Sequence, residues 1–117
     1  MSDQTSESQC IDMDKLTETF MNNMDIVKQV LSSFKGSFVT FEEEFLNAQQ
    51  QGDTELMSRL AHGLKGSAGN IRASSLSAKA ADLQHKIDQG EAPGLLVEEV
   101  ISGLAALICE IDAVTTG

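Results

Sequence analysis

Residues 61–71, AHGLKGSAGNI, are the stretch around which the rest of the chain is organised. The stretch contains His62, Lys65 and three glycines, although the apolar residues on either side of it repeat at helical spacing. Glycine costs about 1 kcal/mol relative to alanine inside a helix, so its presence here indicates close approach by another group. We therefore expect a helix with one face kept clear for a partner protein.

His62 falls on the solvent side of this helix, which we expect to run from about residue 54 to residue 70, with Asp53 as its N-cap. At about 100° per residue, an apolar core stripe lies opposite His62 and consists of Leu56, Met57, Leu60, Leu64, Ala68 and Ile71. Polar and small residues share the His62 side, namely Glu55, Ser58, Arg59, Lys65, Gly66 and Gly69. Gly63 projects about 100° away, and we expect it to pack against a neighbouring helix.

The rest of the chain also has helical periodicity. A short helix is expected from Asp12 or Asp14, a long Phe-rich helix over about 25–50, a fourth from Ser74 or Ser75 to about Gly90, and a last one over about 94–114. The sequence thus predicts an all-α fold, an antiparallel four-helix bundle with an additional short N-terminal helix. Residues 1–11 are expected to be a disordered polar tail, and residues 12–117 the folded domain.

Composition excludes several function classes. The 117 residues carry a formal net charge of −10, which disfavours binding to nucleic acid. No stretch reaches the length of a membrane span, and the polar start does not resemble a signal peptide, so we expect a cytoplasmic protein. Cys10 and Cys109 have no CxxC spacing and are expected to be free thiols. Residues 59–86 nevertheless hold five basic residues and one acid, a local charge of +4 that suits an acidic partner.

Sequence motifs for other chemistries are missing. The chain contains neither GxxxxGK[ST] nor GxGxxG, so no nucleotide-binding loop is expected. His62 and His85 are too far apart for a zinc pair, and His85 is interpreted as a surface residue. The three acids Glu42, Glu43 and Glu44 are interpreted as a solvated face, so we expect no metal site.

An exposed imidazole with these neighbours suits phosphoryl transfer. The unprotonated ring nitrogen of His62 can attack phosphorus, and Lys65, one helical turn on, can pair with the charge of the phosphoryl group. Gly66 and Gly69 leave the face flat, so a partner's active site can reach the imidazole. The residue set therefore fits a reaction in which positioning and charge stabilisation dominate.

The stretch resembles the motif of the histidine-containing phosphotransfer (HPt) domain of multistep two-component relays. Ala61, His62, Leu64, Lys65, Gly66, Ser67 and Ala68 match in consecutive register, followed by Ile71 and Ala73, and the order of helices extends the resemblance over about residues 12–114. It implies that His62 is the phosphoacceptor, that Lys65 stabilises the phosphoryl group and that Gln84 hydrogen-bonds near the histidine. Arg72 stands where the family usually has glycine, and we expect Asn70 to take the left-handed conformation in its place.

The resemblance also implies partners. They are response-regulator receiver domains and the receiver of a hybrid sensor histidine kinase, docking on Ser58, Arg59, Gly66 and Gly69, with Mg²⁺ bound by the receiver and no cofactor here. We expect a free-standing, monomeric carrier without autokinase activity. Two alternatives remain: a helical-bundle module that regulates a partner by docking without phosphorylation, and, more weakly, an enzyme that uses His62 as a general base.

Overall fold

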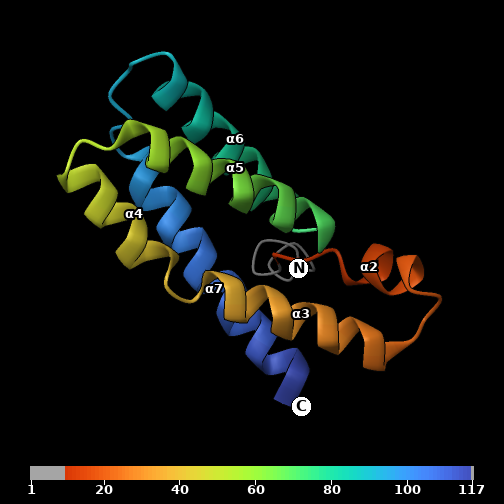
Figure 1. Cartoon of the computed structure of the whole chain (residues 1–117). Helices are drawn as coiled ribbons and strands as arrows, with labels where there is room; N and C mark the ends of the chain where they lie inside the picture. Colours follow the sequence, from red (N-terminus) through yellow and green to blue (C-terminus); the bar gives the residue numbers. More distant parts are fainter. Residues whose placement is uncertain (1–9, 117) are drawn as a thin grey trace, which may run out of the picture.

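The chain folds into helices joined by short loops (Figure 1). The computed structural model describes residues 10–116, so the predicted tail at residues 1–9 lies outside the described residues. The helices within this range are α2 (Met13–Thr19), α3 (Met24–Phe38), α4 (Phe41–Gln50), α5 (Thr54–Asn70), α6 (Ser74–Asp88) and α7 (Leu96–Thr116). The predicted all-α fold is confirmed over residues 10–116, which contain no strand.

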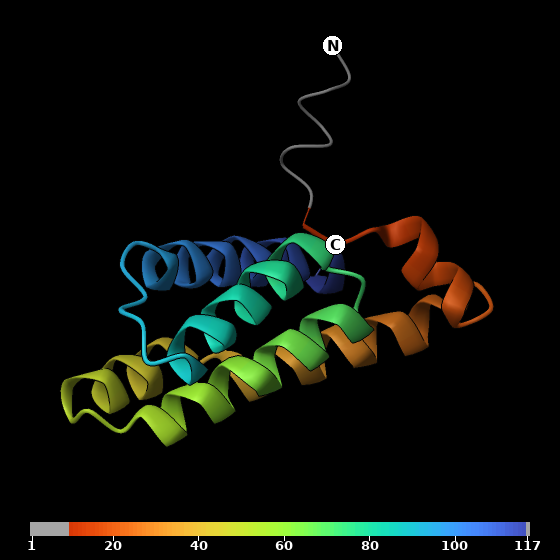
Figure 2. The ribbon, with the colours of Figure 1, turned by 90° about the horizontal axis from the view of Figure 1, so that it is seen from above.

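The helices pack as an antiparallel bundle. Helix α5 lies along α6, and α6 packs on α7 (Figures 1 and 2). Helix α7 also contacts α3, and α4 contacts α5, so each long helix has a neighbour on both sides or continues into one. The short helix α2 packs against α3 at one end, as predicted for the N-terminal helix. The core that these helices share is built from aliphatic side chains and phenylalanines, with Leu16, Leu31, Phe45, Leu64, Leu83 and Leu107 all fully buried. Within the described part of the chain, no helix is long and apolar enough to span a membrane.

The prediction of one continuous helix over residues 25–50 was wrong, because the chain turns at Val39 and Thr40 and divides it into α3 and α4. The phenylalanine stripe continues across the turn, with the rings of Phe38 and Phe41 6.3 Å apart between centroids. Because the phenylalanines keep the three- and four-residue spacing of a continuous helix, the sequence pattern did not indicate the break. Thr40 forms the N-cap of α4 without a side-chain capping bond, and its hydroxyl instead contacts the Glu44 carboxylate at 3.2 Å.

Helix α5 begins and ends with defined caps. The predicted N-cap Asp53 is confirmed, since its carboxylate accepts a hydrogen bond from the Leu56 amide at 3.1 Å. At the other end, the Ala73 amide donates to the Ala68 carbonyl at 2.8 Å and the Arg72 amide donates to the Gly69 carbonyl at 3.0 Å. This is the Schellman pattern, which requires a left-handed residue just beyond the helix.

That left-handed residue is Arg72, with φ of 65°, so the expectation that Asn70 would take this conformation was wrong. Gly52 and Gly90, with φ of 70° and 74°, occupy the equivalent positions after α4 and α6. Arg72 makes two contacts to the N-terminal part of the chain. Its carbonyl accepts from the Asp12 amide, and its guanidinium donates to the Thr19 hydroxyl, both at 3.0 Å. The side chain therefore supplies a bond to α2 that glycine could not.

The two roles of Arg72 can be separated by comparing two variants. Arg72→Ala and Arg72→Gly both lose the bond to Thr19, but only alanine retains the steric cost of a left-handed L-residue. We expect the Gly variant to exceed the Ala variant in unfolding free energy by about 1 kcal/mol, measured by urea denaturation monitored by circular dichroism. Equal stabilities would show that the backbone relaxes at this turn and that Arg72 carries no conformational strain.

The segment before α2 is packed against the bundle, contrary to the expectation that the disordered tail extends to residue 11. Ile11 is 2 % exposed and belongs to the core. The amide of Cys10 donates to the Glu110 carboxylate of α7 at 2.6 Å, and the amide of Ile11 donates to its second oxygen at 3.4 Å. Burial and the negative charge of Glu110 raise the pKa of the Cys10 thiol, which favours the unreactive protonated form. Cys10 and Cys109 are both free thiols among the described residues, as predicted.

Candidate functional site

His62 lies on the exposed face of α5, as the helical periodicity predicted. Ala61 and Leu64, about 100° and 160° from His62 around the helix, are fully buried. Small side chains on both helices, Ala61 and Ala68 on α5 and Ala80 on α6, are fully buried, so they leave room for close packing of the two helices. The core thereby fixes α5 in the orientation that presents His62 to solvent.

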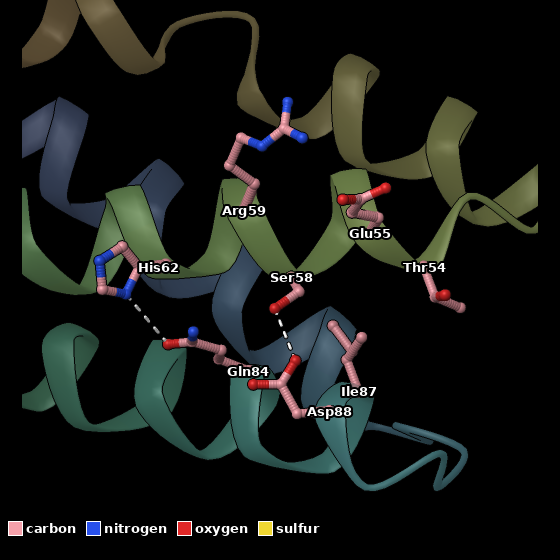
Figure 3. Close-up of a pocket in the computed structure, with 8 residues that line it drawn as sticks. All are labelled: Thr54, Glu55, Ser58, Arg59, His62, Gln84, Ile87 and Asp88. Carbon is pink, nitrogen blue, oxygen red and sulfur yellow. Dashed lines mark hydrogen bonds between the residues drawn. The ribbon is translucent and has the colours of Figure 1, made fainter.

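Gln84 of α6 is the nearest polar partner of His62. Its Oε1 lies 3.4 Å from Nδ1 of the imidazole (Figure 3). A carbonyl oxygen can only accept a hydrogen bond, so this contact is a hydrogen bond in the tautomer that carries the proton on Nδ1. The neutral ring then has its lone pair on Nε2, which points away from Gln84 (Figure 3). The arrangement leaves a nucleophilic nitrogen directed to solvent.

A second contact between α5 and α6 lies one turn from the first. The Ser58 hydroxyl donates to the Asp88 carboxylate at 2.6 Å, beside the His62–Gln84 pair (Figure 3). Both pairs border an open groove of about 560 Å³, whose other lining residues are Thr54, Glu55, Arg59 and Ile87. Asp88 was not predicted as a site residue, although its position four residues after Gln84 on the same helix places both on one face.

The remaining predicted site residues are arranged along α5. Arg59 is exposed and lines the groove. Lys65 is half-buried, does not line the groove, and has its backbone carbonyl bonded by the Ser77 hydroxyl at 2.9 Å. The groove itself contains the acids Glu55 and Asp88 beside Arg59, so the positive charge predicted for residues 59–86 is not uniform over this face.

The three glycines of the motif differ in their surroundings. A Cβ on Gly66 would meet nothing within 4 Å among the described residues, so the protein itself does not require glycine there. A Cβ on Gly69 would lie 3.4 Å from the Ser77 hydroxyl, which assigns this glycine to the contact with α6 as well as to the His62 side. Gly63 is exposed with open space around it, so its predicted packing against a neighbouring helix was wrong.

Metal chemistry receives no support from the arrangement of side chains. Over residues 10–116, no three His, Cys, Asp or Glu side chains are grouped closely enough to hold a metal ion. The polar groups nearest His62 are instead the Gln84 amide and the Ser58–Asp88 pair, which orient groups by hydrogen bonding. What the site offers chemically is one exposed imidazole beside an amide oxygen that can accept its Nδ1 proton, and a cationic side chain one turn further along the helix.

Comparison with known proteins adds one positive result. The chain matches the family model described as the Hpt domain over residues 15–114, which covers most of its length. Searches of curated proteins and of solved structures found no match. The matched range contains α3 to α6 entire, and with them His62, Gln84 and the contacts between α5 and α6. The helical bundle, the exposed histidine on its third long segment and the family match together show that this chain belongs to the Hpt domain family.

Proposed function

We propose that His62 accepts a phosphoryl group from the aspartyl phosphate of one receiver domain and passes it to the aspartate of another, a response regulator. Membership of the Hpt family implies histidine phosphotransfer in a phosphorelay. The observation that supports the specific site is the exposed His62 with Nδ1 held by Gln84 at 3.4 Å. His85 is also exposed, but it has no corresponding polar partner in the described structure and stands outside the motif residues that carry the resemblance.

The transfer follows from the position of the ring proton. The Nε2 lone pair of His62 attacks the phosphorus, an N–P bond forms, and the bond from phosphorus to the aspartyl oxygen breaks, leaving a carboxylate on the donor. The ring becomes positively charged in this step, and Gln84 Oε1 stabilises it by accepting from Nδ1–H. Reversal of the same step on a second receiver returns the neutral imidazole. The protein therefore acts as a carrier and has no need of ATP.

Lys65 and the docking residues have supporting roles in this proposal. Lys65, one turn from His62, pairs with the two negative charges that the phosphoryl group brings. The receiver supplies Mg²⁺, and this chain contributes no cofactor. Ser58 and Arg59 line the groove beside His62, and with Gly66 and Gly69 they form the proposed docking face for the receiver. A monomer suffices, because one histidine and one approaching receiver complete the reaction. The proposed location of this reaction is the cytoplasm.

The proposal is tested by incubating the protein with a receiver domain labelled at its aspartate with radioactive phosphate. We expect the label to appear on this protein in a form that is stable to alkali and lost in acid, as a phosphoramidate requires. An established phosphotransfer protein serves as the positive control for the donor. If a panel of competent receivers labels that control and never this protein, the proposed function is wrong.

A further prediction concerns the charge of Lys65. We expect Lys65→Ala to slow phosphoryl transfer by about ten-fold, the loss of one charge-assisted hydrogen bond, while helical circular dichroism is unchanged. Lys65→Arg, which retains the charge, should recover part of the rate, and Lys79→Ala on α6 is the matched control for loss of a lysine. A loss of helicity in Lys65→Ala would instead assign this half-buried side chain to packing.

A further inference from the structure

The contacts between α5 and α6 follow a single antiparallel register. Gly69 meets Ser77, His62 meets Gln84, and Ser58 meets Asp88. Each step toward the start of α5 matches an equal step toward the end of α6: seven residues between the first two contacts and four between the last two. These steps are one or two helical turns, so the three contacts lie along one seam. The pair that holds the imidazole is the middle contact of the three.

We propose that Ser58 and Asp88 are a positioning pair that holds Gln84 against His62, an inference that rests on the proposed function of His62. Neither side chain contacts the imidazole in the described structure, so they act through Gln84. The Ser58 hydroxyl and the Asp88 carboxylate lie 2.6 Å apart, a short bond to a charged acceptor. In Figure 3 the two dashed contacts lie side by side and connect the same two helices.

The position of Asp88 shows why such a pair is needed. Asp88 is the last residue of α6, and Gln84 lies one turn before it. The last turn of α6 is closed by backbone bonds, from the Gly90 amide to the Ile87 carbonyl at 3.0 Å and from the Glu91 amide to the Lys86 carbonyl at 2.9 Å, but these bonds do not fix the turn against α5. The contact from Gln84 to His62 is already 3.4 Å long, near the limit for a hydrogen bond. A displacement of this turn by a few tenths of an ångström would therefore release Nδ1.

Helix stability does not explain an acid at this position. A negative charge at the C-terminal end of a helix opposes the helix dipole, and an exposed Asp88 is unfavourable there for α6 alone. The carboxylate instead faces the first turns of α5, where Thr54, Glu55 and Ser58 line the same groove. The side-chain hydrogen bond that this carboxylate accepts comes from the Ser58 hydroxyl on the neighbouring helix. The residue thus serves the junction between the two helices.

A similar bond holds the seam on the other side of His62. The Ser77 hydroxyl donates to the Lys65 carbonyl at 2.9 Å, and a Cβ on Gly69 would lie 3.4 Å from the same hydroxyl. Ser77 lies in the first turn of α6 and Asp88 in its last. Gln84 is closer to the Asp88 end, so loss of the Ser58–Asp88 bond should affect it more directly than loss of the Ser77 bond.

The test measures the proton position on His62 by long-range ¹H–¹⁵N NMR of the imidazole in Ser58→Ala and Asp88→Ala. We expect both variants to lose population of the Nδ1–H tautomer and to transfer phosphate about two- to ten-fold more slowly, the range for loss of one net hydrogen bond. Asp88→Asn retains an acceptor for Ser58 and should recover the wild-type tautomer. Asp82→Ala, which removes another exposed acid of α6, should match the wild type.

The result that overturns the inference is a wild-type tautomer population in both alanine variants with helicity retained. A tautomer shift in Asp88→Asn as large as in Asp88→Ala would also overturn it, because charge rather than positioning would then be the cause. The NMR measurement needs no phosphorylation. Failure of the wild type to accept phosphate therefore removes the proposed function, whereas an unchanged tautomer removes the positioning role alone.

Discussion

His62→Gln is expected to accept no phosphoryl group from any phosphorylated receiver. Glutamine retains a polar side chain of similar reach, but its amide nitrogen has no available lone pair with which to attack phosphorus. His62 is exposed and forms no part of the core, so the variant should fold with the wild-type helical content. The measurement is the acid-labile label remaining on the protein after incubation with a receiver phosphorylated at aspartate, and we expect complete loss.

The matched control is His85→Gln, which removes the other histidine of the chain. His85 lies on α6 beside Lys86, whose ammonium contacts Glu91 at 3.5 Å, and away from the groove that contains His62. This variant should be labelled at the wild-type rate. Label that persists in His62→Gln and disappears in His85→Gln would move the phosphoacceptor to α6.

The His62→Gln variant also separates phosphotransfer from the alternative of a docking module. If the protein acts by binding alone, His62→Gln should retain both its affinity for the receiver and its regulatory effect. If it acts as proposed, binding to the unphosphorylated receiver should change little, because the groove residues Ser58 and Arg59 remain, while transfer is lost. Affinity measured by calorimetry and labelling measured in parallel therefore distinguish the two functions.

Periodicity predicted the helices where one stripe of apolar residues faces one core. Helix α5 was predicted over residues 54–70 and has these bounds, because its apolar stripe and its N-cap Asp53 indicate the same helix. The division between α3 and α4 could not be predicted in this way. The phenylalanines continue the stripe across Val39 and Thr40, so the pattern of hydrophobicity is the same with or without a turn.

Contacts between distant segments account for the other differences. Arg72 occupies a left-handed position that favours glycine, and the compensating partners, Asp12 and Thr19, lie more than fifty residues away in sequence. Ile11 was assigned to the tail because its neighbours are polar, but it is buried against the bundle. Local composition carries no information on such tertiary contacts, which override the local preference.

In the candidate site, too, one feature was predictable from the helix alone and others depend on contacts between helices. The exposure of His62 follows from helical geometry alone, whereas its contact with Gln84 was expected from the family resemblance. Asp88 was missed because its significance depends on the register between α5 and α6, which no single helix reveals. That register becomes visible when Gly69–Ser77, His62–Gln84 and Ser58–Asp88 are compared as contacts of one seam.

Gly66 is expected to reveal the approach of the partner, since nothing within the described structure explains a glycine there. A Cβ at this position meets no atom within 4 Å, and the residue is exposed in the middle of α5. Gly66→Ala should therefore increase the unfolding free energy by about 0.5–1 kcal/mol, the gain in helix propensity. Thermal denaturation monitored by circular dichroism measures this gain directly.

A larger side chain at the same position should have the opposite effect on function. Gly66 lies about 40° from His62 around the helix, so Gly66→Leu places a bulky group where the receiver must reach the imidazole. We expect the transfer rate to fall on the order of ten- to hundred-fold, as misplacement of reacting groups by about 1 Å can produce, in a protein at least as stable as the wild type. The matched control is Gly63→Leu, on the same helix but about 100° from His62, which should reduce transfer much less. Equal losses in the two leucine variants would show that the approach is not confined to the Gly66 side, whereas wild-type transfer in Gly66→Leu would mean that the receiver reaches His62 without passing over this residue.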